Sequence, residues 1–222
     1  MKYVSFSLWG DNPLYNVGAI RNAELMPLIY PDWKMILYYD NSVPSETISK
    51  LETLNCILVK VDDFEYGCFW RFFASDLEDC DLVIFRDTDS RINLRERDAV
   101  NAWIETGKSL HVMRDHPAHG IPYGNNTLGI LAGMWGIKGK QLPLTQMIEK
   151  FVVGKKNNYG IDQTFLKMVY NAFELDKVVH DDFFEKKPFP TKRDTMRFVG
   201  ERIGVDELPV NEDWRAITNY VK

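Results

Sequence analysis

The sequence predicts a single α/β domain with a mostly parallel central sheet flanked by helices. Short apolar segments rich in strand-forming residues alternate with segments whose apolar residues recur at helical spacing. The chain has 222 residues, enough for one domain with a full core. One segment, Leu82–Phe85, is apolar throughout, which is typical of a strand buried on both faces of a parallel sheet.

The first part of the chain predicts three strands separated by helices. Residues 2–8 alternate as a strand does, and turn formers follow over 9–13. We expect a helix over 14–29, because its apolar residues have helical spacing and Pro31 follows it. Strands are expected at 34–40 and 56–61, on either side of a short helix within 42–54. This alternation favours parallel pairing.

The remainder continues the pattern. We expect helices over 69–79, 95–106, 142–153 and 161–173, and strands over 82–85, 109–114 and 177–180. Residues 129–139 also have a strand pattern, in which Gly133 and Gly136 indicate a close approach of the backbone to another group, such as a bound sugar. The segment after residue 196 is expected to pack back on the sheet.

Composition excludes some functions. A net charge of −5 argues against a nucleic-acid binder, which needs a basic surface. No segment reaches the ~18 apolar residues of a membrane span. The three cysteines, Cys56, Cys68 and Cys80, are an odd number in apolar surroundings, so we expect free thiols and a cytoplasmic protein.

Two carboxylates directly follow the apolar strand. In extended chain Asp87 and Asp89 share one face, roughly 6 to 7 Å apart at ~3.3 Å of rise per residue. Acids this close repel each other unless a cation is bound. Mn²⁺ or Mg²⁺ fits, because these ions favour oxygen ligands and complete their shell with water and phosphate. The alternative is a polar surface turn.

Further candidates lie elsewhere. Arg71 stands among aromatic residues and needs an anionic partner, either a ligand or a surface acid such as Asp76 or Glu78. Asp40 ends the second strand, where an α/β sheet presents loops to ligands. Asp162 opens a helix, where an acid also meets the helix dipole favourably.

Two polar segments are candidates for substrate contacts. The long loop over 115–126 is expected on the sugar and acceptor side, with Asp115 and His116 as hydrogen-bonding groups, although a loop histidine commonly has a structural role. The basic run over 186–193, which includes Lys192, is either a solvated surface or a flap that neutralises a diphosphate.

Five sequence pieces together resemble a known family. They are SLWGDNPLY, FWRFFA, FRDTDSR, YGIDQTFL and VVHDDFF, and in this order they resemble the small GT-A glycosyltransferase domains found in large DNA viruses of algae and in bacteria. The resemblance covers nearly all of the chain. It implies a nucleotide-binding half over about 1–92 and a sugar and acceptor half over about 93–222.

The resemblance implies a metal-dependent transfer of a hexosyl or deoxyhexosyl group from a nucleoside-diphosphate donor, expected to be a UDP-sugar, to a glycan or other hydroxyl acceptor. It implies Asp89 and His180 as metal ligands, with Asp87 binding the metal directly or through water and ribose. It also places Asp162 under the donor sugar. We expect Asp162 to be the catalytic group, with Asp115 and His116 as the alternatives on a less well fixed loop. Together with the arguments above, the expected substrate-binding residues are Leu8, Asp40, Arg71, Asp87, Asp115, His116, Gly133 and Lys192.

Two other functions remain open. A phosphohydrolase of the haloacid dehalogenase type also uses Asp-x-Asp after an apolar strand, but on its first strand and with Gly or Thr next, whereas here three strands come first and Ser90 follows. The third possibility is a non-catalytic module that binds nucleotide sugars or glycans.

Overall fold

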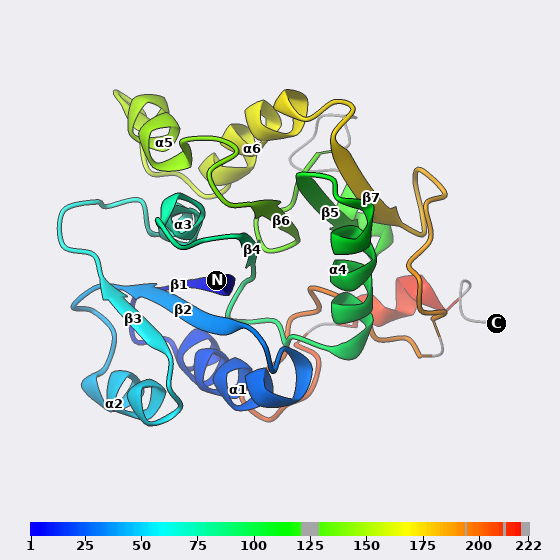
Figure 1. The fold of residues 1–222 in the computed structure, drawn as a ribbon. Helices are drawn as coiled ribbons and strands as arrows, with labels where there is room; N and C mark the ends of the chain where they lie inside the picture. The colour runs from blue at the N-terminus through cyan, green and yellow to red at the C-terminus, as the bar shows by residue number, and fades with distance from the viewer. Residues whose placement is uncertain (121–128, 194, 211, 219–222) are drawn as a thin grey trace.

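The computed structural model describes residues 1–120, 129–193, 195–210 and 212–218, and every statement below concerns these. One sheet runs through the molecule, with the strand order β3-β2-β1-β4-β6-β5-β7 (Figure 1). Its strands are β1 Lys2–Leu8, β2 Lys34–Tyr39, β3 Ile57–Lys60, β4 Leu82–Phe85, β5 Leu110–Arg114, β6 Trp135–Lys138 and β7 Lys177–Asp181.

The sheet is mostly parallel, as the sequence predicts. β1 pairs in parallel with β2 and β4, β2 with β3, and β5 with β7. β6 lies between β4 and β5 and is antiparallel to both. As a result β6 begins at the edge of the sheet where the parallel strands end.

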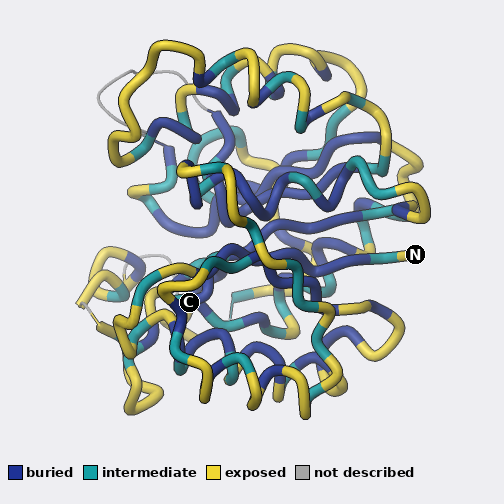
Figure 2. Tube along the Cα trace, turned by 90° about the vertical axis from the view of Figure 1, so that its left-hand side faces the viewer, coloured by how far each residue is buried: buried dark blue, intermediate teal, exposed yellow. Residues whose placement is uncertain are grey.

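Helices cover both faces of the sheet (Figure 1). The helices are α1 Pro13–Ile29, α2 Ser45–Thr53, α3 Gly67–Trp70, α4 Leu94–Thr106, α5 Leu144–Val152 and α6 Ile161–Ala172. One apolar core joins α1, α2 and α4 to the sheet, and another joins α3, α5 and α6 to the opposite face. The central strands are buried, and exposed residues follow the outer helices and loops (Figure 2).

Asparagine side chains cap two helices at the edge where the parallel strands end. Asn12 accepts a hydrogen bond from Leu14 N at the start of α1, and Asn93 accepts one from Glu96 N at the start of α4, both 3.0 Å long. Each cap satisfies a backbone donor that the helix leaves free. The starts of α1 and α4 are thereby fixed next to the loops that follow β1 and β4.

The helix expected over 69–79 is only partly present. α3 ends at Trp70 and continues as a 3₁₀ helix, η1, over Arg71–Asp76. The reason lies in β1: Ser7 Oγ accepts from Arg71 N at 2.8 Å, and Ser5 Oγ donates to Arg71 O at 2.7 Å. Serine side chains thus bind backbone groups that an α-helix would pair within itself.

The C-terminal part packs back on the sheet, as expected. Phe189 and Val199 join a third apolar cluster with Met113 of β5 and Ala99 of α4. No helix among the described residues is long and apolar enough to cross a membrane.

Candidate functional site

The loops after β1 and β4 separate at the centre of the sheet. From β1 the chain passes through α1 to β2 on one side, and β4 lies on the other side of β1. In open α/β sheets ligands bind in the crevice at such a switch point, beyond the carboxyl ends of the strands. Asp87 and Asp89 lie in the loop directly after β4.

Helix α1 fixes this loop. Asn22 donates to Ser90 O at 2.8 Å and accepts from Ile92 N at 3.0 Å. A Cβ atom on Gly18 would lie 1.9 Å from Thr88 O, so only glycine allows the helix to come this close. The two acids therefore stand on a turn that is held by backbone contacts with a long helix.

Alternation along β4 sends successive side chains to opposite faces. Phe85 packs in the core beneath α3 and α6. The next residue, Arg86, is buried on the other face, where its Nε donates to Glu96 Oε1 of α4 at 3.1 Å. Asp87 returns to the face of Phe85, and its Oδ1 accepts a hydrogen bond from Arg71.

Arg71 is buried and lies between two acids. Its Nη1 binds Asp87, and its Nη2 lies 3.4 Å from Asp162 Oδ2. The prediction that this arginine needs an anionic partner is confirmed, but the partners are carboxylates of the site. The surface acids Asp76 and Glu78 are not the partners, and the expected contact between Arg71 and substrate stays a prediction.

Asp162 stands in the first turn of α6 and is 6% exposed. Burial raises the pKa of its carboxyl, and the charge of Arg71 opposes this rise. The backbone N of Gln163 donates to Asp162 Oδ1 at 2.9 Å. A buried acid next to a cation, at the end of a rigid helix, is a group that can accept or orient a proton.

Gln163, the residue after Asp162, fixes the backbone segment that lies next to Asp87. Its amide, oriented to satisfy both neighbours, donates to Ile130 O at 2.7 Å and accepts from Ala132 N at 2.9 Å. This holds the chain that leads to Gly133. A Cβ atom there would lie 2.0 Å from Asp87 Oδ2, so the close approach expected at Gly133 is present, and the group it meets is Asp87.

Asp89 has a different partner. Its Oδ2 accepts from Arg202 Nε at 3.1 Å, and its backbone O accepts from Ile203 N at 2.7 Å. Burial, and then the charge of Asp87, raise the pKa of Asp89 to about 6. The sequence reasoning missed Arg202; its only signal was a cation between two glycines in the strand-like run GERIG.

The rim of the site carries polar and aromatic side chains. Tyr15 of α1 faces the two acids: burial and the charge of Asp89 raise its pKa. Trp9, in the loop after β1, is half exposed and meets Trp70 edge-on, with ring centroids 6.0 Å apart. Neither aromatic residue was singled out from the sequence.

Two expected nucleotide-side residues lie at this edge. Ser42 binds Asp40 Oδ1 through its hydroxyl and through its backbone N, the latter at 3.0 Å, and its Oγ accepts from Gly10 N at 2.6 Å. Asp40 thus ties together the loops after β1 and β2. Leu8 is 1% exposed and its side chain packs in the core, so its expected substrate contact stays a prediction for the backbone alone.

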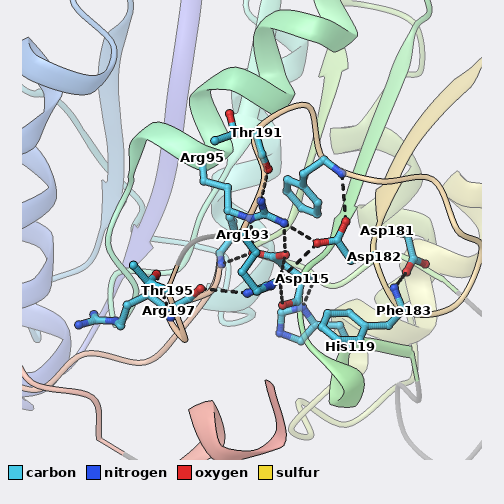
Figure 3. A network of polar contacts seen from close by, with 12 residues as sticks. Arg95, Asp115, His119, Asp181, Asp182, Phe183, Thr191, Arg193, Thr195 and Arg197 are labelled. Carbon is cyan, nitrogen blue, oxygen red and sulfur yellow. Dashed lines mark hydrogen bonds and ion pairs between the residues drawn. The ribbon is translucent and has the colours of Figure 1, made fainter. Parts of the chain in front are cut away.

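Asp115 is a structural residue, and the prediction that it binds substrate is wrong. Its carboxylate is fully buried and accepts from Arg95 at 2.9 and 3.0 Å, from Val199 N at 2.9 Å, and from Arg193 (Figure 3). Arg95 and Arg193 also pair with Asp182. These bonds tie α4, β5 and the C-terminal segment together and leave the carboxylate closed to a ligand.

The prediction that His116 binds substrate is also wrong. Its Nδ1 accepts from Ala118 N at 3.0 Å, and its Nε2 lies 2.9 Å from Asp213 O. The ring packs on Phe198, with centroids 4.5 Å apart. Both ring nitrogens are therefore occupied. Residues 121–126 of the same expected loop lie outside the described residues.

His180 does not reach the two acids, so its prediction as a metal ligand is wrong. β7 lies three strand positions from β4, roughly 14 Å at ~4.8 Å per strand. The Nδ1 of His180 lies 2.8 Å from Nε2 of His111, whose ring stacks on Trp103 of α4. The two histidines therefore lie on the α4 face of the sheet, whereas the side chain of Asp87 lies on the opposite face.

Lys192 is exposed on the rim of an open surface hollow formed with Asp181, Asp182 and Phe189 beyond β7. Its neighbour Arg193 belongs to the buried network around Asp115. In the described part of the chain, Lys192 has no contact with Asp87 or Asp89. The flap over a diphosphate expected from this run stays a prediction.

A divalent metal fits Asp87 and Asp89 as a site with few protein ligands. Among the described residues, no three His, Cys, Asp or Glu side chains gather as a ligand set. Arg71 takes Oδ1 of Asp87 and Arg202 takes Oδ2 of Asp89, so within the described ranges the second oxygen of each acid accepts no hydrogen bond. Two carboxylate oxygens, completed by water and phosphate, suit Mg²⁺ or Mn²⁺.

Comparison with solved structures identifies the fold of this chain. No family model matches the sequence, and no curated protein matches it significantly. The galactosyltransferase LgtC, solved with donor and acceptor sugar analogues, matches with a TM-score of 0.53 and 16% identity, over 81% of this chain and 73% of that one. The apo form of the glycosyltransferase GlyE of Streptococcus pneumoniae gives 0.51 and 17%, over 82% and 45%.

S. aureus TarS, residues 1–349, gives a TM-score of 0.51 and 14% identity, over 82% of this chain and 58% of that one. At these identities the similarity establishes the fold alone, and the chain has the GT-A fold that its sequence predicts. The resemblance to viral domains stays a prediction.

Proposed function

We propose that this GT-A protein is a metal-dependent glycosyltransferase that moves a sugar from a nucleoside-diphosphate donor to a hydroxyl group of a glycan. One observation carries the proposal: two carboxylates with open oxygens stand at the switch point of the sheet, and a buried arginine links one of them to a third acid, Asp162. The fold neighbours LgtC, a galactosyltransferase solved with donor and acceptor sugar analogues, and GlyE, a glycosyltransferase, support sugar transfer.

The two acids of the turn have the first role. Asp87 and Asp89 would hold Mn²⁺ or Mg²⁺, which when bound neutralises charge that develops on the departing diphosphate. Gly133 leaves room for the carboxylate of Asp87, because a Cβ atom there would lie 2.0 Å from Oδ2. Arg71 balances the charge of Asp87 from below.

Asp162 has the catalytic role in this proposal. Arg71 holds its carboxylate on the same side of the sheet as Asp87, and α6 keeps it rigid. From there it would accept the proton of the acceptor hydroxyl or stabilise positive charge on the sugar ring. Its raised pKa moves it toward the range in which a carboxylate works as a base.

The nucleoside would lie toward the loops after β1 and β2. Asp40 stands there, and the exposed ring of Trp9 and the ring of Tyr15 give aromatic surface against which a base can pack. UDP is the proposed nucleotide. On this view residues 1–92 mainly bind the nucleotide and 93–222 the sugar and acceptor. A cytoplasmic location is proposed from the three free cysteines.

Turnover of nucleotide sugars tests the proposal. Ligand-observed NMR with a panel of nucleotide sugars and Mn²⁺ identifies the donor, and its hydrolysis or transfer is then measured with Mn²⁺ and with EDTA. Metal-dependent loss of the donor supports a transferase. Binding without turnover indicates a non-catalytic module, and release of phosphate from simple phosphate esters indicates a phosphohydrolase. The last is disfavoured because Asp87 and Asp89 follow β4 and not the first strand.

A further inference from the structure

A C-terminal segment closes over the turn that carries Asp87 and Asp89. We name residues 200–210 the strap. Its Ile203 N donates to Asp89 O at 2.7 Å. Arg91, in the same turn as the acids, binds Glu207 of the strap through two bonds of 2.9 and 3.2 Å. The strap is folded on itself by a bridge between Ile203 and Pro209. Its backbone is therefore anchored beside Asp89.

The side chain of Arg202 is freer than its backbone. The side chain is 46% exposed, whereas that of Asp89 is 14% exposed, so the guanidinium lies on the solvent side of the carboxylate. Its described contact with an acid is the single bond from Nε to Asp89 Oδ2. Arg71, by contrast, is 7% exposed and lies between two acids. Arg71 is fixed, and Arg202 can move.

Arg202 stands where a metal ion would act. A divalent ion between Asp87 and Asp89 needs the charge of Asp89, which Arg202 already neutralises. A guanidinium this close also repels the ion. With the ion held there, the charge of Asp89 would be satisfied, and the diphosphate of the donor would offer Arg202 a new anionic partner. A long side chain on an anchored backbone can turn from one to the other.

We propose that Arg202 is an exchangeable counter-cation: it neutralises Asp89 in the metal-free protein, releases it when the metal binds, and then binds the diphosphate of the donor. This rests on the proposed function. It assigns Arg202 as a positioning residue for the donor and the strap as the element that carries it. It also makes a distinctive prediction, because losing Arg202 must change the affinities for metal and nucleotide in opposite directions.

The test uses Arg202→Gln, with Mn²⁺ alone and then UDP in the presence of saturating Mn²⁺ as the probes. Binding of Mn²⁺ is measured by electron paramagnetic resonance of the free ion, and binding of UDP by calorimetry. Without Arg202 the affinity for Mn²⁺ should rise, and that for UDP should fall, each roughly threefold to fivefold, the scale of a partly exposed ion pair. Arg202→Lys keeps the charge and should restore most of both affinities.

Arg215→Gln is the matched control. It removes the same charge from the C-terminal segment, where Arg215 pairs with exposed Glu212. It should change neither affinity. If Arg202→Gln shifts both affinities in the same direction, or no more than Arg215→Gln does, the exchange is refuted while the proposed function stands. If EDTA leaves UDP binding intact and Arg202→Gln abolishes it, Arg202 replaces the metal and the exchange is again refuted. If the wild type binds neither Mn²⁺ nor UDP, the proposed function falls and this inference with it.

Discussion

The guanidinium of Arg71 lies 3.4 Å from the carboxylate of Asp162 while it also binds Asp87. These two acids come from a strand end and a helix start that are 75 residues apart, 162 minus 87. A single buried cation therefore sets the spacing between the metal side of the site and the proposed catalytic group.

Replacing Arg71 should impair both stability and activity. Arg71→Gln leaves Asp162 buried without its cation, and we expect a loss of about 3 kcal/mol in the free energy of unfolding, the scale for breaking a buried pair. Arg71→Lys should recover only part of it, because an ammonium lacks the planar fork that spans two acids. Urea denaturation measures the loss. Arg215→Gln, at an exposed pair with Glu212, should stay close to wild type.

Asp89→Asn should abolish metal-dependent binding of nucleotide and leave the fold intact. The amide keeps the shape of the side chain but lacks the charge that the metal needs. Because the folded state raises the pKa of Asp89, its ionised form does not stabilise the fold, so the variant should melt within a few degrees of wild type at pH 7.5. Calorimetry with UDP and Mn²⁺ is the measurement. Unchanged affinity would remove Asp89 from the site.

Metal affinity should depend on pH around the pKa of about 6 of Asp89. Below that pH a proton competes with the metal, and the affinity for Mn²⁺ should fall about tenfold per pH unit. The folded pKa lies above the unfolded value, so this residue stabilises the fold as pH falls from 6 toward 4, and loses that contribution as pH rises. Measuring the affinity for Mn²⁺ at several pH values between about 5 and about 8 checks the slope. A flat profile would contradict it.

Asp162→Asn should lower turnover by about 10² or more with little change in donor affinity, which is the scale of losing a general base. Asp115→Asn is a useful contrast. It disrupts the buried network of Arg95 and Arg193, so it should destabilise the fold without a specific effect on the chemical step. Comparing kcat, donor affinity and melting temperature for both variants separates the roles. Normal turnover in Asp162→Asn would end its assignment.

Gly133→Ala should weaken binding of metal and donor while the protein still folds. The new Cβ would lie 2.0 Å from Asp87 Oδ2, a side-chain atom that can rotate away. Asp87 is thereby moved off the site and away from Arg71, at a smaller cost in stability than a clash with backbone atoms. Gly18→Ala is different, because its Cβ would meet the backbone O of Thr88 at 1.9 Å and should lower stability strongly. Melting curves and calorimetry distinguish the two, and full binding by Gly133→Ala would be the contrary result.

The sequence predicts the sheet well and the polar contacts only in part. Strand ends follow from apolar runs and turn residues, which are local signals. Six strands lie within two residues of where the sequence places them, whereas β6 covers only Trp135–Lys138 of the pattern over 129–139. Asp87 and Asp89 are recognisable for the same reason, because the apolar strand that marks them lies directly before them in the sequence. The helix after Tyr66 is shorter than the sequence predicts, because Ser5 and Ser7 of β1 bind the backbone of Arg71.

The errors concern residues whose role depends on distant partners. Asp115 and His116 have the composition of a ligand loop, but Arg95, Arg193 and the C-terminal segment occupy their polar atoms. His180 ends a strand at the correct edge, yet strand order and side-chain alternation put it on the other face. Arg202 lies 113 residues after its partner in the chain, and no local pattern indicates that pairing.

Because Asp89 is paired with a residue of the strap, Asp87 and Asp89 are expected to meet their partners at different stages of folding. The partner of Asp87 precedes it by 16 residues, whereas the partner of Asp89 follows by 113. Contacts of small sequence separation form early, and distant ones carry a larger entropic cost of loop closure. During folding Asp87 is therefore expected to meet Arg71 early, while Asp89 remains uncompensated until the strap has docked. Docking of the strap is thus the step that turns an acidic turn into a balanced site.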